Sequence, residues 1–307
     1  MNRIRASLAL ALALAASLLI AACGGGGNDE DPQEVLNATF NNDQTVQSGV
    51  FDISVDVNAE GGDNAGTFEA TLGGPFQGQE GQFPAFDVEA EINLEGSDQD
   101  FSGSGGLVST GEAAFINFQG TDYEVPKQLF DQFATQFTQL QQQSEQEQGG
   151  NLLKSLGIDP TNWLSDLENE GTEDVEGTET IHIAGTADTP ALIEDIKQIA
   201  ENAPQAAGEV TPDELNQLDQ LTEIVESADF DIFTGEDDDI LRKLEADIAL
   251  DPPDSEGAPE SVDLDFSVTL SAINEPQTVE PPSSSQPLGS LLQQFGLDEG
   301  ALNQLGG

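Results

Sequence analysis

The chain has 307 residues, and its 7 Lys and Arg stand against 59 Asp and Glu, which gives a formal net charge of −52. This balance excludes a nucleic-acid-binding protein, because phosphate contacts require clustered Lys and Arg. Hydrophobic residues make up 36% of the chain and include 16 Phe, enough for a packed core. The single Cys and single His leave no disulfide framework and no Cys/His metal centre. We therefore expect a folded protein with an acidic, strongly hydrated surface and no cofactor.

The N-terminal segment predicts export. Two arginines precede an uncharged run of mostly Ala and Leu over residues 6–22, which is typical of a secretory signal peptide. The run ends in Ile20-Ala21-Ala22-Cys23, which resembles a bacterial lipobox. We predict a lipoprotein signal peptide at 1–22 and a diacylglyceryl group on the sulfur of Cys23. A transmembrane anchor and an ordinary signal peptide are the alternatives, although a span needs about 20 apolar residues.

The residues after Cys23 predict a tether. A Gly run at 24–27 leads into acidic residues without apolar periodicity, so residues 23–34 are interpreted as a flexible segment. Three explanations of the acidity of the whole chain are open: it keeps the protein soluble, it adapts the protein to high external salt, or it stores bound cations. We favour the first two explanations, because an exported protein meets ambient salt directly.

Strands open the folded region. Apolar and polar residues alternate over 51–58 and 86–95, a two-residue period that places the apolar set on one face of an antiparallel sheet. Weaker strand patterns cover 67–72, 101–109 and 113–118, with Gly, Asn and Asp at the breaks. These residues predict a meander of about five strands.

Helices follow, and each begins at a proline. Leu and Phe recur at three- and four-residue steps after Pro126, which predicts a helix with an apolar face. Asp159-Pro160 predicts a short helix that carries Trp163, Leu164 and Leu167, and Thr189-Pro190 predicts another. Thr211-Pro212 adds a capping box and predicts a helix through Val225 with a stripe of leucines. Residues 180–185 are predicted to form a strand between two of these helices.

Apolar and polar residues alternate again over 230–234, 240–250 and 261–271. This pattern predicts a second meander of strands. Strands, helices and strands again indicate an α+β fold with one large antiparallel sheet and helices on one face. We assign residues 35–286 to a single domain and residues 287–307 to a tail with short helical pieces around Leu291 and at 302–305.

The order of several weak motifs resembles a known family. They comprise the lipobox, the passage Phe118–Pro126, Gly157–Leu164, Thr178–Pro190, Gly235–Leu244 and Asn274–Pro281. Together they resemble the LppX, LprA, LprF and LprG lipoproteins of actinobacterial envelopes, which are similar in fold to the LolA and LolB lipoprotein carriers. The resemblance implies a strongly curved sheet, a half-barrel closed by helices, whose apolar interior holds acylated lipids. The acidity, the Gln-rich run 139–148 and the extra helix at 211–228 depart from the family.

The phenylalanines are the candidate lining of a lipid cavity between the sheet and the helices. Such a cavity needs apolar area and few polar groups. The alternative is that the rings fill an ordinary core, because aromatic stripes at helical spacing are usually core. The candidate residues are Phe68, Phe86, Phe115, Phe118, Phe130, Phe133 and Phe137.

Other candidate sites are weak. His182 alternates with two isoleucines and faces away from them, and no nucleophile motif accompanies it, so we interpret it as a satisfied or surface histidine. Residues 236–239 are acidic but lack the spacing of a Ca²⁺ loop, so we expect a hairpin turn there. We predict no metal site, no catalytic residue and no enzymatic activity.

Two functions remain open. The first is a carrier or binder of a lipid or another apolar ligand, anchored by Cys23 to the extracytoplasmic face of the cell membrane. The second is an envelope interaction or sensor module with a filled core and a protein partner. A continuous apolar cavity would favour the first function, and an exposed apolar patch over a filled core would favour the second.

Overall fold

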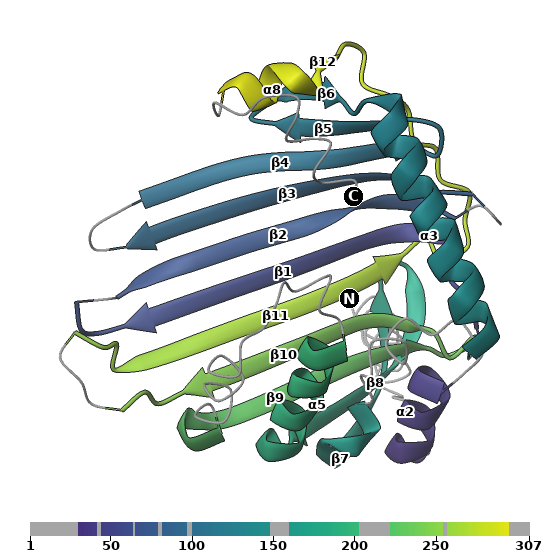
Figure 1. Cartoon of the computed structure of the whole chain (residues 1–307). Helices are drawn as coiled ribbons and strands as arrows, with labels where there is room; N and C mark the ends of the chain where they lie inside the picture. The colour runs from purple at the N-terminus through teal and green to yellow at the C-terminus, as the bar shows by residue number, and fades with distance from the viewer. Residues whose placement is uncertain are drawn as a thin grey trace, which may run out of the picture.

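The computed structural model describes residues 30–41, 44–63, 65–78, 82–96, 100–147, 160–202, 222–253 and 257–294. In this part of the chain, twelve strands form one open sheet in the order β12-β6-β5-β4-β3-β2-β1-β11-β10-β9-β8-β7 (Figure 1). All neighbours are antiparallel except β12 and β6. The predicted α+β fold with a large antiparallel sheet is confirmed, and the sheet does not close into a barrel.

Two meanders make up this sheet. The first contains β1 (Ser48–Glu60), β2 (Gly66–Gln77), β3 (Ala85–Gly96), β4 (Asp100–Thr110), β5 (Ala114–Phe118) and β6 (Thr121–Glu124). The second contains β7 (Leu164–Val175), β8 (Thr178–Ala187), β9 (Val225–Gly235), β10 (Leu241–Leu250) and β11 (Ser261–Ser271). They join where β1 pairs with β11 over eleven residue pairs, so segments about 200 residues apart in sequence lie side by side.

The helices all lie on one face of the sheet (Figure 1), as predicted. They are α2 (Pro32–Asn41), α3 (Lys127–Glu147), η1 (Pro160–Asn162), α5 (Thr189–Asn202) and α8 (Leu288–Gln294). α2 and α5 lie at the β7–β9 end of the sheet, α8 lies beside β6 at the opposite end, and α3 crosses one set of strand ends. None of these described helices is long and apolar enough to cross a membrane.

Two buried clusters hold the helices to the sheet. The first, at the β7–β10 end, contains Val35, Leu36, Phe40, Trp163, Leu164, Ile181, Ile183, Ala228, Phe230, Ile232 and Ala246. The second, at the β5–β6 end, contains Ala114, Tyr123, Val125, Phe130, Leu288 and Leu291. We call them the β8–β9 cluster and the β5–β6 cluster.

The prediction of a helix carrying Trp163, Leu164 and Leu167 is wrong. The 3₁₀ turn η1 ends at Asn162, and Leu164 begins β7. A register shift between Ser165 and Glu168 gives β7 one residue more than its partner strand, so Leu164 and Leu167 both contact the β8–β9 cluster. Bulges insert one extra residue into a strand. This bulge places Leu164 and Leu167, three residues apart, on the same face, which is the spacing expected of a helix.

The helix predicted from Thr211 cannot extend to Val225 or to residue 228. Val225 is the first residue of β9, and Ala228 is a buried strand residue. The predicted leucine stripe of this helix and the predicted pieces at 302–305 lie outside the described residues, as do the signal peptide and Cys23.

Helix α2 was not predicted. It begins at Pro32, within the segment interpreted as a tether, and Asp31 Oδ1 accepts the backbone N–H of Gln33 at 2.9 Å as an N-cap. Leu36 is completely buried, and Thr39 shares a buried 2.7 Å hydroxyl–hydroxyl hydrogen bond with Thr234 of β9. Asp31-Pro32 is the same start signal that identified the later helices, and the acidic composition around it concealed the helix.

Asn274 joins the two meanders at the strand ends. Its Oδ1 accepts the N–H of Gln47 at 2.9 Å, its Nδ2 donates to the carbonyl of Thr45, and its own N–H donates to the carbonyl of Ser48. Its φ of 58° is one that Asn tolerates better than most residues. The chain then runs to β12 (Gln286–Pro287), which pairs with β6.

Candidate functional site

The two faces of the sheet differ completely in chemistry. One in-register row of apolar residues crosses nine strands: Ile183, Ile232, Leu244, Val268, Ile53, Leu72, Ala90, Gly105 and Phe118. Parallel rows extend it, because successive inward positions on each strand are apolar. We call this side the apolar face; it is the side on which the helices pack.

The middle of the apolar face is uncovered by the described helices. The inward residues of β11, β1, β2, β3 and β4 lie between the two clusters, and we call them the open apolar face. Leu72, Ile92, Leu94, Phe101 and Leu107 on it are between 39% and 58% exposed, whereas Ile183 and Ile232 at the β8–β9 end are at most 1% exposed. Soluble proteins rarely expose so many adjacent large apolar side chains without a functional reason.

Polar groups are nearly absent from the open apolar face. Among the inward residues of its five described strands, Ser109 is the one polar side chain. It is fully buried, and its hydroxyl donates to the carbonyl of Pro84 at 2.9 Å. Two glycines, Gly103 and Gly105, take inward positions on β4 beside Ile92 and Ala90. The face therefore offers apolar area but almost no hydrogen-bonding groups.

The opposite side, which we call the acidic face, carries carboxylates in register. Asp229, Asp247, Asp265, Asp56 and Glu69 lie directly opposite one another on β9, β10, β11, β1 and β2. A side-chain hydrogen bond from Asp265, with some desolvation and the neighbouring negative charges, raises the pKa of Asp247 above its usual value. Like charges placed opposite each other destabilise a sheet, so this row of carboxylates is expected to destabilise the sheet.

Six of the seven candidate phenylalanines lie on the apolar side. Phe68 and Phe86 are inward residues of β2 and β3, and Phe118 packs against the β5–β6 cluster. Phe130 and Phe137 of α3 form edge contacts with the ring of Phe83, at centroid distances of 5.5 and 5.2 Å. Phe133 lies on the same helix but is 43% exposed.

Phe115 is not part of this group. It pairs with Val108 of β4 and Glu124 of β6, so it points to the acidic side of the sheet, opposite Phe118 and Phe86. The sequence at 113–118 hid this alternation, because the outward Phe115 is as apolar as the inward Ala114, Ile116 and Phe118.

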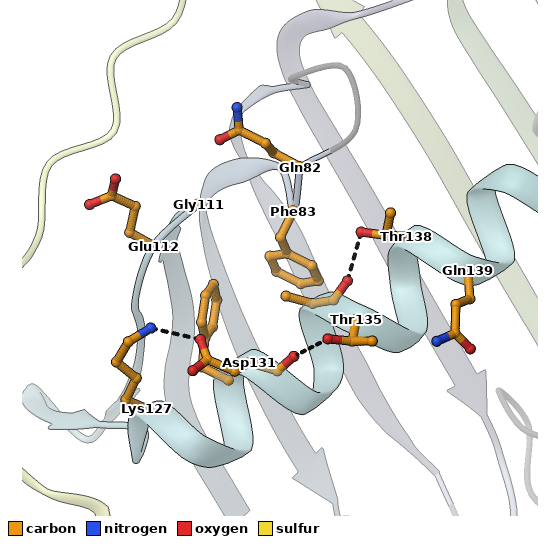
Figure 2. A pocket seen from close by; sticks show the side chains of 11 residues that line it. Gln82, Phe83, Gly111, Glu112, Lys127, Asp131, Thr135, Thr138 and Gln139 are labelled. Carbon is orange, nitrogen blue, oxygen red and sulfur yellow. Dashed lines mark hydrogen bonds and ion pairs between the residues drawn. The ribbon is translucent and has the colours of Figure 1, made fainter.

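A shallow groove of about 730 Å³ lies beside α3, between the helix and the loops at residues 82–83 and 111–112; its lining side chains are drawn in Figure 2. Four of its polar side chains are paired within α3: Lys127 bonds Asp131 at 2.7 Å, and the hydroxyls of Thr135 and Thr138 donate to helix carbonyls. Phe83, Phe130 and Ala134 supply its apolar wall. Phe133 does not line this groove.

His182 is a satisfied histidine on the acidic side, as predicted. Its Nε2 lies 2.6 Å from Asp231 Oδ1, and its ring stacks on Phe233 at a centroid distance of 4.3 Å. The sequence did not indicate the two carboxylates beside it, Asp231 and Glu173, because both come from neighbouring strands.

The acidic turn at 236–239 closes the β9–β10 hairpin. Asp238 Oδ2 accepts a 2.6 Å bond from the guanidinium of Arg242, which is buried, and Asp238 Oδ1 accepts the N–H of Ile240. The pKa of Glu179 is raised by a side-chain hydrogen bond with Glu236 and by their mutual repulsion. Among the described residues, no group of three or more His, Cys, Asp or Glu is placed to hold a metal ion.

Comparison with solved structures finds the following similar proteins. LprF from Mycobacterium bovis is 11% identical over 82% of this chain and 97% of its own, with a TM-score of 0.36. The Mycobacterium tuberculosis lipoprotein LppX is 10% identical over 82% and 100%, with a TM-score of 0.34. A DUF1329 family protein from Desulfovibrio piger is 9% identical over 80% and 93%, with a TM-score of 0.19.

No family model and no curated protein sequence matches the chain. LprF and LppX are two of the lipoproteins that the sequence motifs resemble. The fold itself is established by the strand order and register of this chain.

Proposed function

We propose that the protein is a membrane-tethered envelope lipoprotein that binds or carries a lipid or a lipidated molecule on the open apolar face. The observation that carries this proposal is the in-register apolar surface between the two buried clusters, with Leu72, Ile92, Leu94, Phe101 and Leu107 partly exposed. Six of the seven candidate phenylalanines lie on this side of the sheet. The proposed role is binding, without catalysis.

The chemistry of the surface favours acyl chains over a protein. Protein interfaces carry about one hydrogen bond per 100–200 Å² and have polar rims, whereas the inward residues of β1, β2, β3 and β11 are apolar throughout. Acyl chains need apolar area and shape alone. The acidic face supports solubility on the other side of the same sheet.

Native mass spectrometry of protein purified from its own membrane tests the ligand. Wild-type protein should carry a lipid, and Ile92→Asn should lose it, because the amide places polar groups among acyl chains. Glu91→Asn is the matched control: it lies next to Ile92 on β3 but points to the acidic face, and it should retain the lipid. Absence of lipid from the wild type, or equal retention in both variants, would contradict the proposal.

Membrane attachment is tested separately at Cys23. Cys23→Ser should abolish labelling with radioactive fatty acid and release the protein from the membrane fraction. A Cys23→Ser protein that stays on the membrane would contradict the proposed lipid anchor on the extracytoplasmic face and leave lipid binding by the sheet intact.

The second candidate function is an envelope interaction module. It is favoured by the high exposure of Phe101, at 58%, which suits contact with a partner protein. A photoreactive phenylalanine analogue at position 101 discriminates the two functions in cells. A lipid adduct supports the binder, and a protein adduct without lipid supports the interaction module.

A further inference from the structure

The two ends of the open apolar face differ in what covers them. At one end, which we call the α3 end, helix α3 crosses the strand ends, and β2 passes into β3 beneath it (Figure 1). At the other end, which we call the hairpin end, β1 turns into β2 and β3 turns into β4. These two turns are neighbours, because Gly66 pairs with Gly96. No described helix lies over the hairpin end (Figure 1).

Phenylalanine rings close the α3 end. The ring of Phe83, between β2 and β3, lies 5.5 and 5.2 Å from two rings of α3. It also lies 6.0 Å from the ring of Phe86, which pairs in register with Phe76. We call these rings the phenylalanine cluster: Phe51, Phe76, Phe83, Phe86, Phe130 and Phe137. The cluster offers apolar contact to the end of an acyl chain and has no side chain that could bind a polar head.

The hairpin end leaves its apolar residues open. Its last inward row across β4, β3, β2, β1 and β11 is Phe101, Leu94, Phe68, Val57 and Leu264. Phe101 is 58% exposed and Leu94 is 40% exposed. The ring of Phe101 lies over Gly103, where an added Cβ would be 3.1 Å from the ring, so the ring lies against the apolar face. The apolar surface therefore continues to the end of the sheet and meets water there.

The length of the open apolar face suits an acyl chain lying along the strands. From Phe86 to Leu94, eight residues of β3 span about 26 Å. One acyl chain spans about 15 Å, half the hydrocarbon thickness of a bilayer. A chain that starts at the phenylalanine cluster thus fits on the face and leaves its polar head toward the hairpin end, where the head stays in water.

The hairpin end carries negative charge only. Residues 48–110, which contain β1, β2, β3, β4 and both turns, include no Lys and no Arg. Glu60, Asp63, Glu95 and Asp100 lie at this end, and Glu95 pairs directly with Asp100. An anionic head at the hairpin end would meet several like charges and no cation of these strands, so its presence there is unfavourable.

We propose that the ligand lies along β1, β2, β3 and β4 with its acyl chains against the phenylalanine cluster and its polar head at the hairpin end, and that this head carries no net negative charge. The carboxylates of the hairpin end repel an anionic head and accept a zwitterionic or uncharged one. This inference rests on the proposed lipid-binding function and specifies the orientation and the charge class of the lipid.

The charge class is tested with vesicles of equal parts dioleoylphosphatidylcholine and dioleoylphosphatidylglycerol. The two lipids have the same acyl chains, and both are presented by the same vesicle, so repulsion between the vesicle and the acidic protein affects them equally. Native mass spectrometry of the full-length protein, stripped of lipid and then incubated with the vesicles, measures which lipid is taken up. At about 0.1 M salt the zwitterionic lipid should be preferred about tenfold, and the preference should shrink at about 1 M salt.

Two double variants assign the preference to the hairpin end. Glu95→Gln with Asp100→Asn should lower it to about twofold or less. Asp87→Asn with Glu89→Gln removes the same charge from the acidic face about 20 Å or more away along β3, which is about two Debye lengths at 0.1 M salt, and should keep the full preference.

The outcomes separate this inference from the proposed function. Equal uptake of the two lipids by the wild type would overturn the inference and leave lipid binding intact. A preference that survives the change of Glu95 and Asp100 would do the same. Uptake of neither lipid would overturn the proposed function and this inference together.

The orientation is tested with a phosphatidylcholine that carries a photoreactive group at the end of one acyl chain. Irradiation of its complex with the full-length protein should label the phenylalanine cluster, and mass spectrometry of the digested protein locates the adduct. The same lipid with the photoreactive group on its head should label the hairpin end around Phe101. The reverse pattern, or labelling of the same residues by both probes, would overturn the proposed orientation.

Discussion

The β8–β9 end and the middle of the sheet carry the same kind of inward residues but bury them to different extents. Ile183 and Ile232 are at most 1% exposed under α2, α5 and η1, whereas Ile92 on β3 is 41% exposed. Sequence alternation is equally clear in both regions. Burial therefore depends on which strands the helices reach, and the stretch of sheet that no described helix covers keeps its large apolar side chains partly exposed.

The largest expected difference between the two regions is in stability. Ile183→Ala should lower the free energy of unfolding by about 2–5 kcal/mol, because it leaves a cavity in a filled cluster. Ile92→Ala should cost only about 1 kcal/mol, mainly through strand propensity. Equilibrium denaturant unfolding of both variants, stripped of lipid, measures the difference. Equal losses would show that the middle of the sheet is also a closed core.

Helix α3 repeats the comparison on a smaller scale. Phe137→Leu should cost about 1 kcal/mol or slightly more, because it removes the edge contact with Phe83. Phe133→Leu should cost less than about 0.5 kcal/mol, as expected for an exposed side chain, yet it should alter the amount of co-purifying lipid. Thermal unfolding and lipid recovery measured on the same samples test both statements. A larger stability loss for Phe133→Leu would place that ring in a packed core.

The acidic face extends across both regions and should respond to salt in both. Raising monovalent salt from about 0.1 M to about 1 M shortens the Debye length from about 10 Å to about 3 Å. The repulsion along the carboxylate row should weaken, and stability should rise by about 1 kcal/mol or more, roughly 2–4 °C in Tm. The difference between Ile183→Ala and Ile92→Ala should not change with salt. A flat or falling Tm would remove the explanation of the acidity by salt adaptation.

The smallest effect concerns one pair within that row. Since the pKa of Asp247 is raised in the folded state, the folded protein binds more protons than the unfolded chain, and stability falls as pH rises from about 4 through the raised pKa. Asp265→Asn should remove this dependence and stabilise the protein at pH 7 by a few tenths of a kcal/mol. Asp263→Asn is the control on the same strand face, since it pairs with Asn58 and Ala249. An identical pH profile for both variants would contradict the role of the pair.

Local chemistry in the sequence determined much of this protein. The two-residue alternation over 51–58, 86–95 and 261–271 predicted strands and their faces, because side chains point alternately to the two sides of a sheet. Proline and cap signals predicted α3 and α5. The same rules failed at Leu164 and Leu167, where a bulge changed the period, and at Asp31-Pro32, where acidic composition concealed a helix.

The tertiary structure alone decided how the two meanders combine. The pairing of β1 with β11 joins distant segments, and no local pattern encodes which edges meet. That pairing lines up the carboxylates of β9, β10, β11, β1 and β2, and it places the open apolar face between the two clusters. The open apolar face thus arises from long-range packing, because the same alternating strand forms a buried core where a helix covers it and a partly exposed apolar surface where no described helix does.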